Sequence, residues 1–179
     1  MDTKFTADYY RMTGISASKK VMFAANMLLR HNIRYMYLLR KYENRPNLFT
    51  KYMLYMLGRK YGLEISCDAH IGPGVYLGHP YNITVAEGTT IGKNVNLHKG
   101  CTIGRENRGG RSGVPTIGDR VYVGIGAVIV GGITIGDDVL IAPNSFVNFD
   151  VPSHSVVIGN PATIHPRNNA TESYVNFLV

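Results

Sequence analysis

The sequence has few cysteines and no long apolar run. Its 179 residues include two cysteines, Cys67 and Cys101. They lack the CxxC or Cys/His spacing of a zinc site or a disulfide framework, so we expect two free thiols and no bound metal. No stretch of about 18 apolar residues is present, and residues 1–14 (MDTKFTADYYRMTG) lack a basic tip followed by an apolar stretch. We therefore expect neither a spanning helix nor a secretory signal, and a cytoplasmic location.

Acidic residues are scarce in the first third of the chain. Residues 1–63 hold 12 Lys/Arg against 3 Asp/Glu, whereas residues 64–179 hold 7 against 9, within a total net charge of +7. The basic balance therefore belongs to the N-terminal segment. Such a segment could meet an anionic surface at the inner face of a membrane, nucleic acid or an acidic partner, or it could be only a solvated helical face.

What the chain does contain is an aliphatic residue at every sixth position. This interval fits neither a helix period of 3.6 nor strand alternation, so it is an internal repeat. Glycine often follows the aliphatic residue, and a small or β-branched residue stands four places after it. Two inward side chains per hexad predict a short flat strand, with glycine permitting the turn to the next. The aliphatic positions are Ile65, Ile71, Leu77 and Ile83, then after a slip of two Val85, Ile91, Leu97 and Ile103, and finally Ile117, Val123, Ile129, Ile135, Ile141 and Val147.

Three hexads make a triangular coil, and stacked coils bury an aliphatic prism that no single coil could bury. In this pattern the chain resembles the hexapeptide-repeat acyltransferases. The resemblance implies a mainly β fold, a left-handed parallel β-helix, and assembly as a homotrimer or a higher oligomer. The left hand comes from the resemblance alone, because the usual rule for parallel crossovers favours the right hand.

The repeat divides the chain into segments. Residues 1–63 carry apolar residues at helical spacings and predict two or three helices ended by Gly62, with packing or oligomer contacts as the role of their Met and Tyr stripes. Residues 64–164 are expected to form the β-helix, with residues 150–164 capping it and residues 165–179 forming a C-terminal tail. The polar, glycine-rich stretch 104–116 interrupts the repeat and predicts a protruding active-site loop.

His79 stands at the third place of the hexad LGHPYN, where a side chain points away from the prism. Residues 64–164 resemble the serine acetyltransferase branch, in which a histidine at this place is the general base and a carboxylate fifteen residues upstream orients it. The resemblance therefore implies His79 as base and Glu64 as its orienting carboxylate, although Asp68 could replace Glu64. A neutral imidazole can accept the proton of a hydroxyl, and the carboxylate stabilises the imidazolium that forms.

The resemblance also implies acetyl-CoA as cosubstrate, in a groove between two subunits, with no permanently bound cofactor. The positions that match the coenzyme groove are Gly104, Gly124, Ile125, Ala142 and Pro143. The loop arginines Arg105, Arg108 and Arg111 are suited to coenzyme phosphates, to an anionic group of the acceptor, or only to solvent. His98, at a coil edge near the loop, is a further candidate for acceptor binding. Cys101 occupies an inward place and is rejected as a nucleophile.

The acceptor is suggested by a departure from the serine acetyltransferase pattern. Those enzymes carry a second histidine before a proline at the end of the loop, where this chain has Val114. Loss of that polar contact should weaken selectivity for serine. We therefore expect an O-acetyltransferase of a sugar or glycan hydroxyl, in surface polysaccharide synthesis, with serine O-acetyltransferase of cysteine biosynthesis as the alternative.

Another class of function is a non-catalytic or metal-binding scaffold. Only His79 and His98 lie between residues 71 and 153, so no histidine set for a metal is evident. The expected partners are a small-molecule acetyl donor, a hydroxyl acceptor, further copies of the chain and a membrane surface, without nucleic acid.

Overall fold

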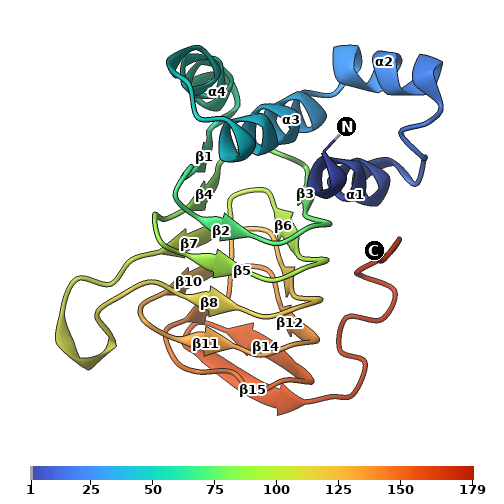
Figure 1. Ribbon diagram of the computed structural model, residues 1–179. Coiled ribbons are helices and arrows are strands. Elements are labelled where there is room, and N and C mark those ends of the chain that lie inside the picture. Colours follow the sequence, from blue (N-terminus) through green and yellow to red (C-terminus); the bar gives the residue numbers. More distant parts are fainter. Residues whose placement is uncertain (1) are drawn as a thin grey trace.

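The computed structural model describes residues 2–179 and places four helices on one end of a β-solenoid (Figure 1). The helices are α1 (Thr3–Thr13), α2 (Lys20–Leu29), α3 (His31–Asn44) and α4 (Leu48–Tyr61). Three sheets form the faces of the solenoid, and their strands run parallel except at the last strand of the third sheet. The predicted mainly β fold with a helical N-terminal segment is confirmed.

The strands are short and stack in sequence order. The first sheet contains β1 (Leu63–Ile65), β4 (Ile83–Val85), β7 (Thr102–Gly104), β10 (Val128–Val130) and β13 (Phe146–Val147). The second contains β2 (His70–Ile71), β5 (Thr90–Ile91), β8 (Thr116–Ile117) and β11 (Thr134–Ile135). The third contains β3 (Tyr76–Gly78), β6 (Asn96–His98), β9 (Tyr122–Val123), β12 (Val139–Ile141), β14 (Ser155–Gly159) and β15 (Ala162–Pro166).

The pairing of the first sheet confirms both irregularities of the repeat. Ile65 pairs with Val85, which lies 20 residues later, and Val85 pairs with Ile103 after 18 residues. Ile103 pairs with Ile129 after 26 residues, because the loop adds eight to that turn, and Ile129 returns to Val147 after 18. Every aliphatic repeat position is buried. The core is therefore the continuous prism that the hexads predicted.

The lower end of the prism is closed by a hairpin. Strand β14 pairs parallel with β12 and antiparallel with β15, so the last strand ends the stack. The chain then runs back along the third sheet toward α1 (Figure 1). The carboxylate of Asp138 holds this returning segment, because it accepts hydrogen bonds from the backbone N–H groups of Ala170 and Thr171.

The upper end is closed by helices, and here the expectation of two or three helices was wrong. Residues 3–13, whose polar and aromatic composition gave no clear helical stripe, form α1, and Arg30 takes an extended conformation that separates α2 from α3. Asp8 of α1 accepts hydrogen bonds from the N–H groups of Gly74 and Val75 at 2.8 and 2.9 Å. Arg40 of α3 pairs with Asp8 and also donates to carbonyls of the first turn. This buried ion pair satisfies backbone groups that the end of a β-helix would otherwise leave open.

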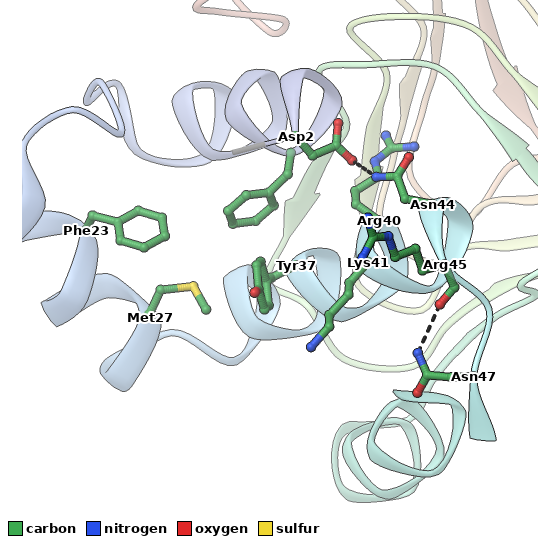
Figure 2. A pocket seen from close by; sticks show the side chains of 10 residues that line it. Asp2, Phe23, Met27, Tyr37, Arg40, Lys41, Asn44, Arg45 and Asn47 are labelled. Atoms are coloured by element: carbon green, nitrogen blue, oxygen red, sulfur yellow. Dashed lines mark hydrogen bonds between the residues drawn. The ribbon is translucent and has the colours of Figure 1, made fainter. Parts of the chain in front are cut away.

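The outer helices leave apolar side chains exposed. No residue of α2 is buried, and Leu28 and Leu29 are 74% and 78% exposed, while Leu48 and Phe49 of α4 are 85% and 71% exposed. A cavity of about 820 Å³ lies among the first three helices, with Phe23, Met27 and Tyr37 around it (Figure 2). Within residues 2–179, none of the helices is long and apolar enough to span a membrane.

Candidate active site

The corner that carries His79 is longer than the corners stacked beneath it. Buried Leu77 and Val85 are eight residues apart, whereas Leu97 and Ile103, at the equivalent corner one turn on, are six apart. The two extra residues are accommodated by a left-handed conformation at His79, with φ of 47°. The side chain of His79 is exposed, as predicted. In the described part of the chain this side chain makes no hydrogen bond.

The helices hold this corner in place. His31, the first residue of α3, donates from Nε2 to the carbonyl of Pro80 at 2.9 Å. Its ring stacks on Tyr61 with 3.8 Å between ring centroids. The N–H of Asn82 donates to the carbonyl of Tyr61 at 3.1 Å. Sequence reasoning missed His31 and Tyr61 because nothing in a helical stripe shows which distant corner it contacts.

The predicted coenzyme residues lie mainly on the same edge as His79. Lys99 lies at the corner one turn below His79, and Ile125 and Pro143 lie at the next two corners of the same edge, which backbone hydrogen bonds link to Lys99. At Gly124, an added Cβ would lie 2.7 Å from the backbone nitrogen of Pro143, so only glycine fits. Ile125 is 45% exposed. This edge therefore offers backbone and one apolar side chain to an extended ligand, beginning below the proposed base.

Glu64, Gly104 and Arg105 gather elsewhere. They line a hollow of about 500 Å³ on the first sheet, near the opposite edge from His79. No hydrogen bond or ion pair joins Glu64 to His79 among the described residues. Asp68, the alternative orienting carboxylate, is exposed at the corner after β1, where its carbonyl accepts from the N–H of Gly88. The pairing of His79 with either carboxylate thus remains a proposal.

The loop 104–116 leaves the solenoid and returns, as Figure 1 shows between β7 and β8. Glu106 and Gly113 exchange two backbone hydrogen bonds of 2.9 Å at its neck. Arg111 donates to the carbonyl of Asn148 on its own chain, whereas the side chain of Arg108 is exposed. Val114 is half-buried, and its Cγ2 lies 3.7 Å from the position of a Cβ on Gly88. Val114 therefore lies on the Arg105 edge, away from His79.

Two titratable groups next to the edge that carries His79 have strongly shifted pKa values. Burial, and secondarily the charge of His79, lowers the pKa of His98 to about 4. The Nε2 atom of His98 is buried and has no hydrogen-bond partner in the described chain. Burial raises the pKa of Cys101 to about 12, so this thiol stays protonated at neutral pH. An inward, protonated thiol agrees with its rejection as a nucleophile.

The depressed pKa of His98 predicts a specific dependence of stability on pH. An unfolded histidine titrates near pH ~6.5, so the unfolded chain binds this proton before the folded chain does. The free energy of unfolding should therefore lose a contribution as pH falls from about 6.5 to about 4. Urea unfolding across that range should show a shallower loss in His98→Gln than in the wild type. Parallel curves for the two proteins would contradict the shifted pKa.

Comparison with known proteins was consistent with the repeat and the fold. The model of the family described as bacterial transferase hexapeptide (six repeats) matches residues 115–148. A serine acetyltransferase of Helicobacter pylori is 39% identical over 101 residues, covering 56% of this chain and 59% of that protein. One of Staphylococcus aureus is 38% identical over 103 residues, covering 58% of this chain and 48% of that protein. The chain thus spans about half the length of these relatives.

Solved structures extend the similarity to the helices. The serine acetyltransferase of Brucella abortus superposes with a TM-score of 0.74 at 26% identity, over 94% of this chain and 68% of that one. The soybean serine acetyltransferase apoenzyme gives 0.72 at 26% identity, over 90% and 66%. The repeat is similar to that of the bacterial hexapeptide transferases, and the solenoid has the fold of the serine acetyltransferase structures. In sequence, too, the chain is similar to serine acetyltransferases.

Proposed function

We propose that this protein is an acetyl-CoA-dependent O-acetyltransferase with His79 as general base. His79 accepts the proton of the acceptor hydroxyl while the oxygen attacks the thioester carbonyl. The carbon–sulfur bond then breaks, and the coenzyme thiolate leaves and is protonated by the imidazolium. Within one chain neither Glu64 nor Asp68 bonds to His79, and both lie near the Arg105 edge, so an orienting carboxylate would have to reach His79 from the Arg105 edge of a neighbouring subunit. The similarity to serine acetyltransferases carries this proposal, and the exposed His79 above the coenzyme edge supports it.

The acceptor we propose is the hydroxyl of L-serine. The relatives and the solved structures described above are serine acetyltransferases, which favours serine over the sugar or glycan hydroxyl expected from Val114. A valine still offers no polar contact to an amino acid at that position. The sugar acceptor therefore remains the second candidate, favoured by Val114 alone.

The proposed site is completed between subunits of a homotrimer. In one chain, His79, Ile125 and Pro143 share one edge, whereas Arg105 and Val114 share another. Closed rotational symmetry brings one edge of each subunit against the other edge of its neighbour. Such an arrangement would place the loop arginines of one subunit near the base and the coenzyme of the next.

The acceptor is tested by measuring thiol release from acetyl-CoA with L-serine, nucleotide sugars and oligosaccharides on one preparation. We expect the largest kcat/KM for L-serine. Val114→His should raise it further, by adding a polar contact, and Val114→Ala is the size-reducing control. A sugar preferred over serine by the wild type would overturn the serine proposal and establish the second candidate. If no acceptor in the panel led to thiol release, both proposed acceptors would be contradicted.

We further propose that α2 and α4 contact an anionic membrane surface. Their exposed Leu28, Leu29, Leu48 and Phe49 lie in the segment that holds +9 of charge. Apolar side chains flanked by Lys and Arg are suited to the boundary between head groups and acyl chains. Both helices lie at the end of the molecule away from β15 (Figure 1).

Vesicle sedimentation tests this contact. The wild type should bind vesicles of phosphatidylglycerol and phosphatidylcholine, should bind phosphatidylcholine alone less, and should be released by salt. Lys20→Gln/Lys51→Gln should weaken the binding, and Lys93→Gln, on the β-helix, is the matched control. Equal binding by all three proteins, or binding by none, would leave the exposed helical faces as contacts between copies of the chain.

A further inference from the structure

A second cavity lies between the third sheet, α1 and the returning C-terminal segment. It is separate from the coenzyme edge, which is the edge that carries His79, Ile125 and Pro143. Its volume is about 290 Å³, close to the lower limit of about 300 Å³ for small-molecule pockets. Aromatic rings of three strands line it in succession: Tyr76, His98 and Tyr122, followed by Tyr174 of the C-terminal segment. Neighbouring centroids are 5.9, 4.6 and 5.2 Å apart. The wall is therefore a ladder of rings that a flat or cyclic ligand can cover.

The charge of the cavity wall is positive. Arg11 and Arg30 line it, and no acidic residue does. Arg11 is only 2% exposed, yet its hydrogen bonds go to carbonyl and amide oxygens, at Gly74, Asn94 and Asn96, rather than to a carboxylate. Asp8 is the nearby carboxylate, but it is ion-paired with Arg40. Burial lowers the pKa of Arg11 to about 10 although the charge of Asp8 opposes this shift, so an anion bound beside Arg11 would further stabilise the charged guanidinium.

Four polar atoms of the aromatic rings in the wall have no hydrogen-bond partner in the described chain. The hydroxyls of Tyr76, Tyr122 and Tyr174 make no hydrogen bond within the described chain. The Nε2 atom of His98 is buried and likewise unpartnered. Because the His98 imidazole is neutral at physiological pH, the positive charge comes from the two arginines. Such a wall can satisfy several oxygen atoms of one ligand at once.

We propose that this cavity binds an organic anion of about monosaccharide size, whose carboxylate or phosphate meets Arg11 and Arg30 and whose ring covers the tyrosines. This site goes beyond the proposed acetyl transfer, which requires only the coenzyme edge, the base and the loop. It lies beside the base, because His98 pairs in register with Gly78, the residue before His79. A Cβ at Gly78 would lie 2.4 Å from the His98 ring, so the wall of the cavity packs directly against the residue before His79.

Calorimetric titration of the full chain without acetyl-CoA tests the proposal. The probes are D-glucuronate, D-glucose 6-phosphate and neutral D-glucose, which share a ring and differ in charge. Both anions should bind saturably, compete with each other and weaken as salt increases, while glucose should bind at least about tenfold more weakly, since charged contacts are worth more than neutral ones. A difference between the two anions then identifies carboxylate or phosphate as the preferred group.

Variants separate the cavity from the general charge of the protein. Arg30→Gln should weaken the binding of both anions several-fold. Arg30→Lys should retain most of the affinity because it keeps the charge. Tyr174→Phe should weaken them less, and Arg59→Gln on α4 is the matched control that should change nothing. Equal binding of glucose and the anions, an equal effect of Arg30→Gln and Arg59→Gln, or Kd values weaker than about 10 mM for every probe would each overturn the proposal.

Discussion

His79→Ala should lower the turnover of acetyl-CoA by about 10²–10⁴, the range expected for the loss of a positioned general base. The side chain is exposed and makes no hydrogen bond in the described chain, so the fold and its thermal midpoint should be unchanged. Thiol release at saturating acetyl-CoA measures the effect. Glu64→Gln should cost less, because it removes the charge and retains part of the orientation.

A histidine elsewhere on the surface serves as the control for this variant. His165 of β15 is exposed, so His165→Ala should keep full turnover. His31→Phe keeps the stack on Tyr61 and loses the hydrogen bond to Pro80, so it should lower kcat with little change in KM. Near wild-type turnover by a folded His79→Ala would contradict the proposal that His79 is the general base, and His98 would be the next candidate.

Asp8→Ala should lower the free energy of unfolding by about 3–5 kcal/mol, the range for breaking a buried ion pair. Arg40 is 1% exposed and would lose its buried carboxylate partner, keeping only Glu43, and the N–H groups of Gly74 and Val75 would lose their acceptor. The helices would then detach more easily from the first turn of the solenoid. Urea unfolding followed by circular dichroism measures the loss.

An exposed ion pair is the matched comparison. Lys93 and Asp119 lie 3.8 Å apart with side chains 53% and 34% exposed, so Lys93→Gln should cost about 1 kcal/mol or less. The double variant Asp8→Leu/Arg40→Met should be more stable than Asp8→Ala, because it does not leave the buried Arg40 guanidinium without Asp8. Similar losses for Asp8→Ala and Lys93→Gln would show that the buried pair does not secure the end of the solenoid.

The repeat could be predicted from the sequence, whereas the contacts of the candidate active site could not. A hexad such as that of Ile129 predicts its own geometry, because a buried aliphatic residue and a small residue recur at a fixed interval. Packing of each turn against its neighbours offsets the chain entropy that the turn loses on folding. The repeat pattern therefore specifies the fold. Helix α1 lacked such a pattern: its role depends on one carboxylate, Asp8, that meets backbone 66 residues away.

The sequence by itself determined the prism, a two-residue slip before Val85 and the eight-residue excursion of the loop, because each is a count along a regular repeat. Only the tertiary structure decided that His31 and Tyr61 support the corner, that Glu64 lies with Arg105 instead of in contact with His79, and that Arg11 is buried without a carboxylate. These are contacts between segments far apart in the chain. Side-chain direction and packing set them, and no local period encodes either.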